Sequence, residues 1–248
     1  MLQVKKMLVI LLVASLLAPI FISLADEEPE ITVVVNRIEI NKNYGKPPGT
    51  PGGKPDKPDK TDGGKPGDYK LMGVEWYVDD LPLTLYVGDE GMVYAITQSA
   101  AEWDKYTSAS LVNEVVHNPE ASYIEELQSE IPDYKNELVY DDLDSRTIAV
   151  CYTWYIGDKI IQFDIAFNTD YTWGDADPDG DEVGDPTLMD LQNIATHELG
   201  HGFGLADIYK PKLSHLTMYG YSGYGDVAKR TLEQGDIEGI QALYGVPP

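Results

Sequence analysis

The chain is poor in cysteine, in basic residues and in histidine, and each shortage excludes a class of function. Its 248 residues include one cysteine and four histidines, and 18 basic residues stand against 42 acidic ones. A single cysteine cannot form an intramolecular disulfide, and it excludes zinc modules built on four cysteines or on two cysteines and two histidines. The net charge of -24 repels phosphate backbones, so we expect no nucleic-acid partner.

The first segment, residues 1–25, has the composition of an export signal. Lys5 and Lys6 precede the uncharged apolar run Met7–Leu24, which ends in small residues where a signal peptidase would cut. We therefore expect cleavage and a secreted protein. The alternative is a retained anchor on the outer face of the membrane, because 18 apolar residues are just long enough to span a bilayer.

Residues 26–68 form a short segment followed by a linker. Ile31–Ile40 is rich in β-branched residues, so it is either one strand or a short spacer. In Gly45–Asp68, 13 of the 24 residues are Gly or Pro and none is large and apolar, so this stretch cannot bury enough surface to fold. We expect the folded domain to comprise residues 69–248.

The order of periodic segments in this domain predicts an α+β fold. The predicted strands are Leu71–Val78, Arg146–Tyr155 and Ile160–Asn168. Predicted helices begin near Val93, Ser122 and Leu188, and a last helix follows the capping-box sequence Thr231–Gln234. Apolar and polar residues alternate in Ile160–Asn168, which is typical of a strand with one buried face.

One helical segment carries a pattern of metal-binding residues. His197 and His201 are four residues apart, so their imidazoles project from one helix face, and Glu198 stands beside them. Gly204 can end the helix and turn the chain back, which would bring Asp207 up as a third ligand. Two nitrogens and one carboxylate oxygen suit zinc with a fourth position left for water. Surface histidines on a polar helix face are the alternative.

These residues resemble a known family. The pattern from His197 to Asp207 looks like the extended zinc motif of the metzincin peptidases, and Leu216–Tyr219 resembles their Met-turn in the form typical of matrixins. Gly235–Gly245 is similar to the closing helix of matrixin catalytic domains. The resemblance covers about residues 69–248. It implies a twisted mixed sheet, an active-site helix, a Met-turn with Met218 beneath the metal, and a C-terminal helix.

The chain departs from the family in three ways. Only His117 and His215 remain for the second, structural zinc of vertebrate-type matrixins, so we expect that site to be absent. Matrixins usually place histidine where Asp207 stands, and an aspartate makes the site harder and less cationic. The prosegment cysteine that blocks zinc in many relatives is missing, because Cys151 lies in a predicted strand. We therefore expect no latency of the cysteine-switch type.

The resemblance implies a secreted zinc endopeptidase. Glu198 would act as the general base for water, and substrate would add to Ile160–Asn168 as the upper edge strand of the sheet. We expect a monomer that acts on protein or peptide substrates and touches no membrane unless the N-terminal segment is retained. Two alternatives stay open: a non-catalytic binding or surface-layer protein with the same fold, and a metallohydrolase of cell-wall peptides.

An acidic loop suggests a second metal. Asp175, Asp177, Asp179 and Asp181 alternate with other residues, as in the first half of a calcium-binding loop of the EF-hand type. Position twelve is Pro186 rather than Glu, which excludes a full EF-hand. The loop is either a looser calcium site or a solvated acidic segment.

Overall fold

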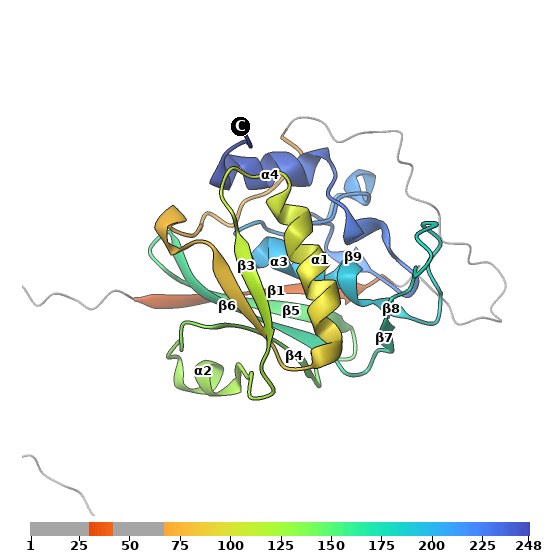
Figure 1. Ribbon diagram of the computed structural model, residues 1–248, viewed down its shortest axis with the longest axis horizontal. Helices are drawn as coiled ribbons and strands as arrows, with labels where there is room; N and C mark the ends of the chain where they lie inside the picture. The colour runs from red at the N-terminus through yellow and green to blue at the C-terminus, as the bar shows by residue number, and fades with distance from the viewer. Residues whose placement is uncertain (1–29, 42–66) are drawn as a thin grey trace, which may run out of the picture.

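The structure is a computed structural model that describes residues 30–41 and 67–248 (Figure 1). The predicted signal peptide and most of the predicted linker lie outside the described residues. Within the described ranges, no helix combines the length and the apolar character needed to cross a bilayer.

A mixed β-sheet forms the centre of the domain (Figure 1). Its strand order is β3-β2-β4-β6-β5-β1-β9. The strands are β1 (Ile31–Ile40), β2 (Leu83–Val87), β3 (Val112–His117), β4 (Asn136–Asp141), β5 (Thr147–Ile156), β6 (Lys159–Asn168) and β9 (Tyr221–Ser222). Neighbours from β3 to β6 run parallel, β5 runs antiparallel to both β6 and β1, and β1 runs parallel to β9. A separate parallel pair joins β7 (Trp173–Gly174) to β8 (Met189–Asp190).

Two long helices pack together on one face of this sheet, as Figure 1 shows. They are α1 (Val93–Asp104) and α3 (Leu191–Gly202), and the other α-helices of the described residues are α2 (Ile124–Ser129) and α4 (Gln234–Tyr244). The buried Trp103 of α1 donates its indole N–H to the carbonyl of Thr196 in α3 over 2.8 Å, which ties the two helices together. The opposite face carries a smaller cluster, in which Tyr123 beside α2 packs with Val150 and Ala166.

The predicted α+β class and the predicted helices are confirmed, and so are the strands that correspond to β5 and β6. The predicted strand Leu71–Val78 is wrong, because this segment makes only isolated bridges at Leu71 and Glu75. The last helix begins two residues later than its capping sequence suggested, because Glu233 rather than Thr231 is the N-cap. Glu233 forms the capping box with Asp236.

Strand β6 differs from its prediction in two respects. It lies between β4 and β5, so the expectation that it forms the edge of the sheet is wrong. Both of its faces are buried. The polar residues Gln162, Asp164 and Asn168 tolerate this burial because they find hydrogen-bond partners inside the protein. The indole of Trp154, for example, donates to Asp164 over 3.0 Å.

The segment Ile31–Ile40 is a strand of this sheet rather than a spacer. It pairs with β5 along almost its whole length, from Ile31 opposite Ile156 to Glu39 opposite Thr147. The sheet thus contains a strand that precedes the predicted start of the domain at residue 69.

Candidate metal centre

Helix α3 and the turn behind it position the predicted ligands. The side chain of Asp190 caps the helix by accepting from the backbone N–H of Asn193 over 2.8 Å. The helix ends at Gly202, and Gly204 has a φ of 102°, in the region that favours glycine. A Cβ at Gly204 would also lie only 2.4 Å from the carbonyl oxygen of Val74. The chain therefore turns back against α3 and carries Asp207 toward the two histidines.

The three predicted zinc ligands converge in the structure. The Nε2 atoms of His197 and His201 lie 3.1 Å apart. The Oδ1 atom of Asp207 lies 3.3 Å from the first and 3.5 Å from the second. Both imidazoles are fully buried and the aspartate is 7% exposed. These residues are one of the groups in the described chain whose ligand atoms could share a metal ion.

Hydrogen bonds on the far side of each ligand fix its orientation. The Nδ1 of His197 is 2.7 Å from the carbonyl oxygen of Thr217, and that of His201 is 2.8 Å from the carbonyl oxygen of Leu205. A carbonyl only accepts, so each Nδ1 carries the proton and each Nε2 presents a lone pair. Tyr209 donates its hydroxyl to Oδ2 of Asp207 over 3.0 Å, which leaves Oδ1 directed at the histidines.

Two facing lone pairs and a carboxylate oxygen repel one another without a cation between them. The Oδ1 of Asp207 has no hydrogen-bond partner among the described residues although it is buried. A divalent ion held by two imidazole nitrogens and one carboxylate oxygen resolves both problems, and this donor set fits zinc with an open position. The residues present therefore fit the metal that the sequence motif implies.

Burial and neighbouring charges shift the pKa of each of the three predicted ligands. Burial lowers the pKa of His197 to about 4, so its imidazole is neutral at neutral pH. Burial also disfavours the charged form of His201, but the negative charge of Asp207 outweighs this and raises the pKa of His201. Burial disfavours the carboxylate of Asp207, yet the two histidines hold its pKa well below the usual value.

Glu198 lies beside the centre, fully buried. Burial raises the pKa of its carboxyl to about 8, although the neighbouring His201 and the backbone N–H of Ile38 act to lower it. Neither carboxylate oxygen has a hydrogen-bond partner of good geometry among the described residues. A buried carboxyl group with both oxygens unused is expensive, which is typical of a functional position.

The predicted Met-turn lies directly against α3. Met218 is 1% exposed, and a Cβ built on Gly200 would come within 2.3 Å of its sulfur. The backbone N–H groups of Thr217 and Met218 both donate to the carboxylate of Asp236, over 2.9 and 3.0 Å. The first turn of α4 therefore holds the backbone of the Met-turn in place.

A buried lysine completes this support, and the sequence analysis missed it. The Nζ of Lys229 donates to the carbonyls of Leu216 and Thr217 over 3.1 Å each and to that of Tyr219 over 2.8 Å. The Thr217 carbonyl also accepts from His197, so the lysine and the ligand share one acceptor. No local sequence pattern around Lys229 indicates such a role. None indicates that Tyr209 donates a hydrogen bond to Asp207 either.

The acidic loop is only partly as predicted. Carboxylate oxygens of Asp177, Asp179 and Asp181 come close enough together to share an ion, and we call these residues the acidic cluster. Asp175 is not part of it, because its carboxylate pairs with Arg230. Exposed acidic groups often gather without a metal, so the geometry leaves calcium binding a prediction.

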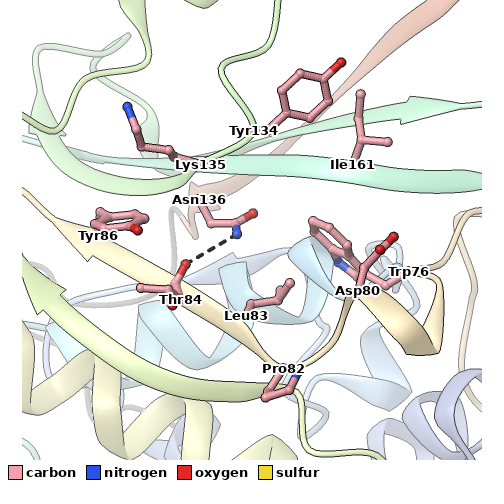
Figure 2. Close-up of a pocket in the computed structure, with 10 residues that line it drawn as sticks. All are labelled: Trp76, Asp80, Pro82, Leu83, Thr84, Tyr86, Tyr134, Lys135, Asn136 and Ile161. Carbon is pink, nitrogen blue, oxygen red and sulfur yellow. Dashed lines mark hydrogen bonds between the residues drawn. The ribbon is translucent and has the colours of Figure 1, made fainter.

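A hollow of about 450 Å³ opens elsewhere, on the side of the sheet near β2 and β4 (Figure 2). It is lined by Trp76, Asp80, Pro82, Leu83, Thr84, Tyr86, Tyr134, Lys135, Asn136 and Ile161. None of these residues belongs to the metal centre, and the amide of Asn136 is bonded to the Thr84 carbonyl over 3.4 Å. The hollow is therefore separate from the predicted metal ligands.

Comparison with known proteins agrees with the geometry. The matrixin family model matches residues 95–245, so the chain belongs to the matrixin family, and the predicted metzincin fold is confirmed. The chain is 42% identical to stromelysin-1 of Mus musculus over 77 residues, which are 30% of this chain and 16% of that protein. It is 38% identical to human matrilysin over 82 residues, which are 33% of this chain and 27% of that protein.

A similar match exists to interstitial collagenase of Bos taurus, with 42% identity over 74 residues. That segment is 29% of this chain and 15% of the collagenase. The chain therefore spans much less than half the length of these relatives.

Proposed function

We propose that the protein is a zinc-dependent endopeptidase with His197, His201 and Asp207 as metal ligands and Glu198 as general base. The convergence of the three ligand atoms beside an unpartnered carboxylate carries this proposal. Membership of the matrixin family supports it. Bound zinc would polarise the scissile carbonyl and make a water molecule more acidic.

The chain's own residues then handle the protons. Glu198 accepts the proton of the attacking water through one of its unused oxygens and passes it to the nitrogen of the leaving amine. Thr217 and Leu205 hold the two imidazoles through their Nδ1 protons, so the ligand atoms keep their direction during turnover. Met218 forms an apolar floor under the centre.

The remaining expectations belong to the same proposal. The signal sequence at residues 1–25 supports secretion, with anchoring to the outer membrane face as the alternative, and residues 26–68 would form the segment and linker before the catalytic domain 69–248. Protein or peptide chains are the substrates of a monomeric enzyme. The acidic cluster would bind Ca²⁺ as a structural ion, because three carboxylates at alternate positions supply the oxygen ligands this ion prefers.

The substitution Glu198→Gln tests the chemistry. It keeps the size of the side chain but removes the base, so we expect zinc content to stay the same and hydrolysis of casein or gelatin to fall at least about a hundredfold. Glu120→Gln, at an exposed position, is the control and should behave like the parent chain. A zinc chelator should abolish the activity of the parent. Retained hydrolysis by the Glu198→Gln protein would refute the assigned role.

A further inference from the structure

The N-terminal strand β1 runs between two parts of the molecule that flank the metal centre. On one side it pairs antiparallel with β5, and on the other it pairs parallel with β9, which follows the Met-turn (Figure 1). The backbone N–H of Glu39 donates to the carbonyl of Gly220 over 3.2 Å. The N–H of Ile40 donates to the carbonyl of Arg146 on the other side, over 3.0 Å. The strand therefore fills the space between β5 and β9.

This strand also packs against α3, the helix that carries His197 and His201. Ile38 is fully buried, and its backbone N–H is close enough to Glu198 to act against the burial that raises the pKa of that carboxyl. Burial raises the pKa of Tyr209, and the negative charge of the next residue in β1, Glu39, adds to this rise. The hydroxyl of Tyr209 donates to Asp207. The pairing with β5 shifts its register between Ile38 and Glu39, at this same place.

The burial of β1 is that of a bound peptide rather than of a core strand. Ile38 is its only buried residue, whereas Ile31 and Val35 are 37% and 44% exposed. The strand is thus held mainly by backbone hydrogen bonds and by one anchoring side chain, which is the pattern of peptides that bind by strand addition. The sequence that connects it to the rest of the domain is rich in glycine and proline.

The direction of β1 is the one expected of a substrate that adds to a sheet edge, because it runs antiparallel to β5. Without β1, strand β5 would end the sheet beside α3, the helix that carries His197 and His201. No thiol takes part, because Cys151 is buried within β5.

We propose that residues Ile31–Ile40 occupy the substrate-binding groove of this peptidase in the direction of a substrate, with Ile38 as the anchor, and so exclude other chains. The inference rests on the proposed function for the identity of the groove. It makes the chain its own inhibitor: a substrate must displace β1 from β5 and β9 before it can bind. The apparent affinity for any other peptide falls by the fraction of molecules in which the groove is open.

The test removes the anchor in the full chain and measures binding instead of turnover. Both variants carry Glu198→Gln, so that no peptide is cut during the measurement. Ile38→Asp places a charge in a buried position and should release β1, whereas Ile131→Asp makes the same change at a site that is 67% exposed. The probe is a fluorescent peptide with the sequence of residues 30–41, and its binding is followed by fluorescence anisotropy.

We expect the Ile38→Asp protein to bind the probe at least tenfold more tightly than the Ile131→Asp protein, which should bind like the parent. Amide hydrogen exchange in β5 should rise in the Ile38→Asp protein and fall again when the probe is added. Equal binding by the two variants would overturn the proposal. So would loss of the cooperative thermal transition in Ile38→Asp alone, because β1 would then be part of the structural core.

The same pair with Glu198 intact separates this inference from the proposed function. Ile38→Asp should then raise kcat/KM for a casein peptide at least tenfold over Ile131→Asp. Tighter probe binding without hydrolysis by either protein would refute the peptidase and leave the occupation of the groove by β1 supported.

Discussion

Replacing the buried Lys229 with methionine should destabilise the whole metal centre. The ammonium group donates to three backbone carbonyls, those of Leu216, Thr217 and Tyr219, and the side chain is 2% exposed. Each buried carbonyl that loses its donor costs about 1–3 kcal/mol. Part of this is recovered because a buried ammonium no longer has to be dehydrated, so we expect a net loss of about 3–5 kcal/mol in the free energy of unfolding.

Urea denaturation of the metal-free chain measures this loss, and competition with a chelator measures zinc affinity. Lys135→Met is the control, because that side chain is 50% exposed and pairs only with the nearby Asp133. A surface pair of this kind is worth about 0–1 kcal/mol. Zinc should bind less tightly to the Lys229→Met protein, since the Thr217 carbonyl that orients His197 loses its second donor. Equal stability of the two methionine variants would refute the reasoning.

The same lysine predicts a dependence on pH. Burial lowers the pKa of Lys229 to about 8 in the folded chain, and an unfolded lysine titrates near about 10.4. Between these values the unfolded chain binds more protons than the folded chain, so this group makes the free energy of unfolding rise with pH. The rise is up to about 1.4 kcal/mol per pH unit. Lys229→Met lacks it, so the gap between the parent and the variant should widen above about pH 8; a narrowing gap would contradict the assignment.

Three further predictions concern the support of the centre and the acidic loop. Gly200→Ala should cost about 1–3 kcal/mol in urea denaturation, because its Cβ would meet the sulfur of Met218; unchanged stability would show that the Met-turn can move away. Tyr209→Phe should lower zinc affinity about tenfold or more in chelator competition, because Asp207 loses its orienting hydrogen bond; an unchanged affinity would remove this role. Calcium should raise the melting temperature if the acidic cluster binds it, and identical melting curves with calcium and with a calcium chelator would show a merely solvated loop.

Local sequence patterns were enough to predict that His197, His201 and Asp207 would come together. A spacing of four residues places His197 and His201 on one helix face whatever surrounds the helix, and Gly204 provides the reversal that brings Asp207 back. Helix periodicity depends on neighbours a few residues apart, so the helices were also predicted correctly. The alternation in β6 correctly indicated a strand, but it could not show that Asp164 would be buried with its own hydrogen-bond partners.

The order of the strands had no such local signature. Backbone hydrogen bonds between strands look the same for every sequence, so nothing in β6 shows that it lies inside the sheet rather than at its edge. Whether Ile31–Ile40 is a spacer or a strand between β5 and β9 depends on surfaces more than a hundred residues away. Lys229 reaches the Met-turn only because its segment packs against α3, where its backbone N–H donates to the side chain of Asn193. Contacts of this kind arise from the folded chain as a whole, and they are what places β1 between β5 and β9.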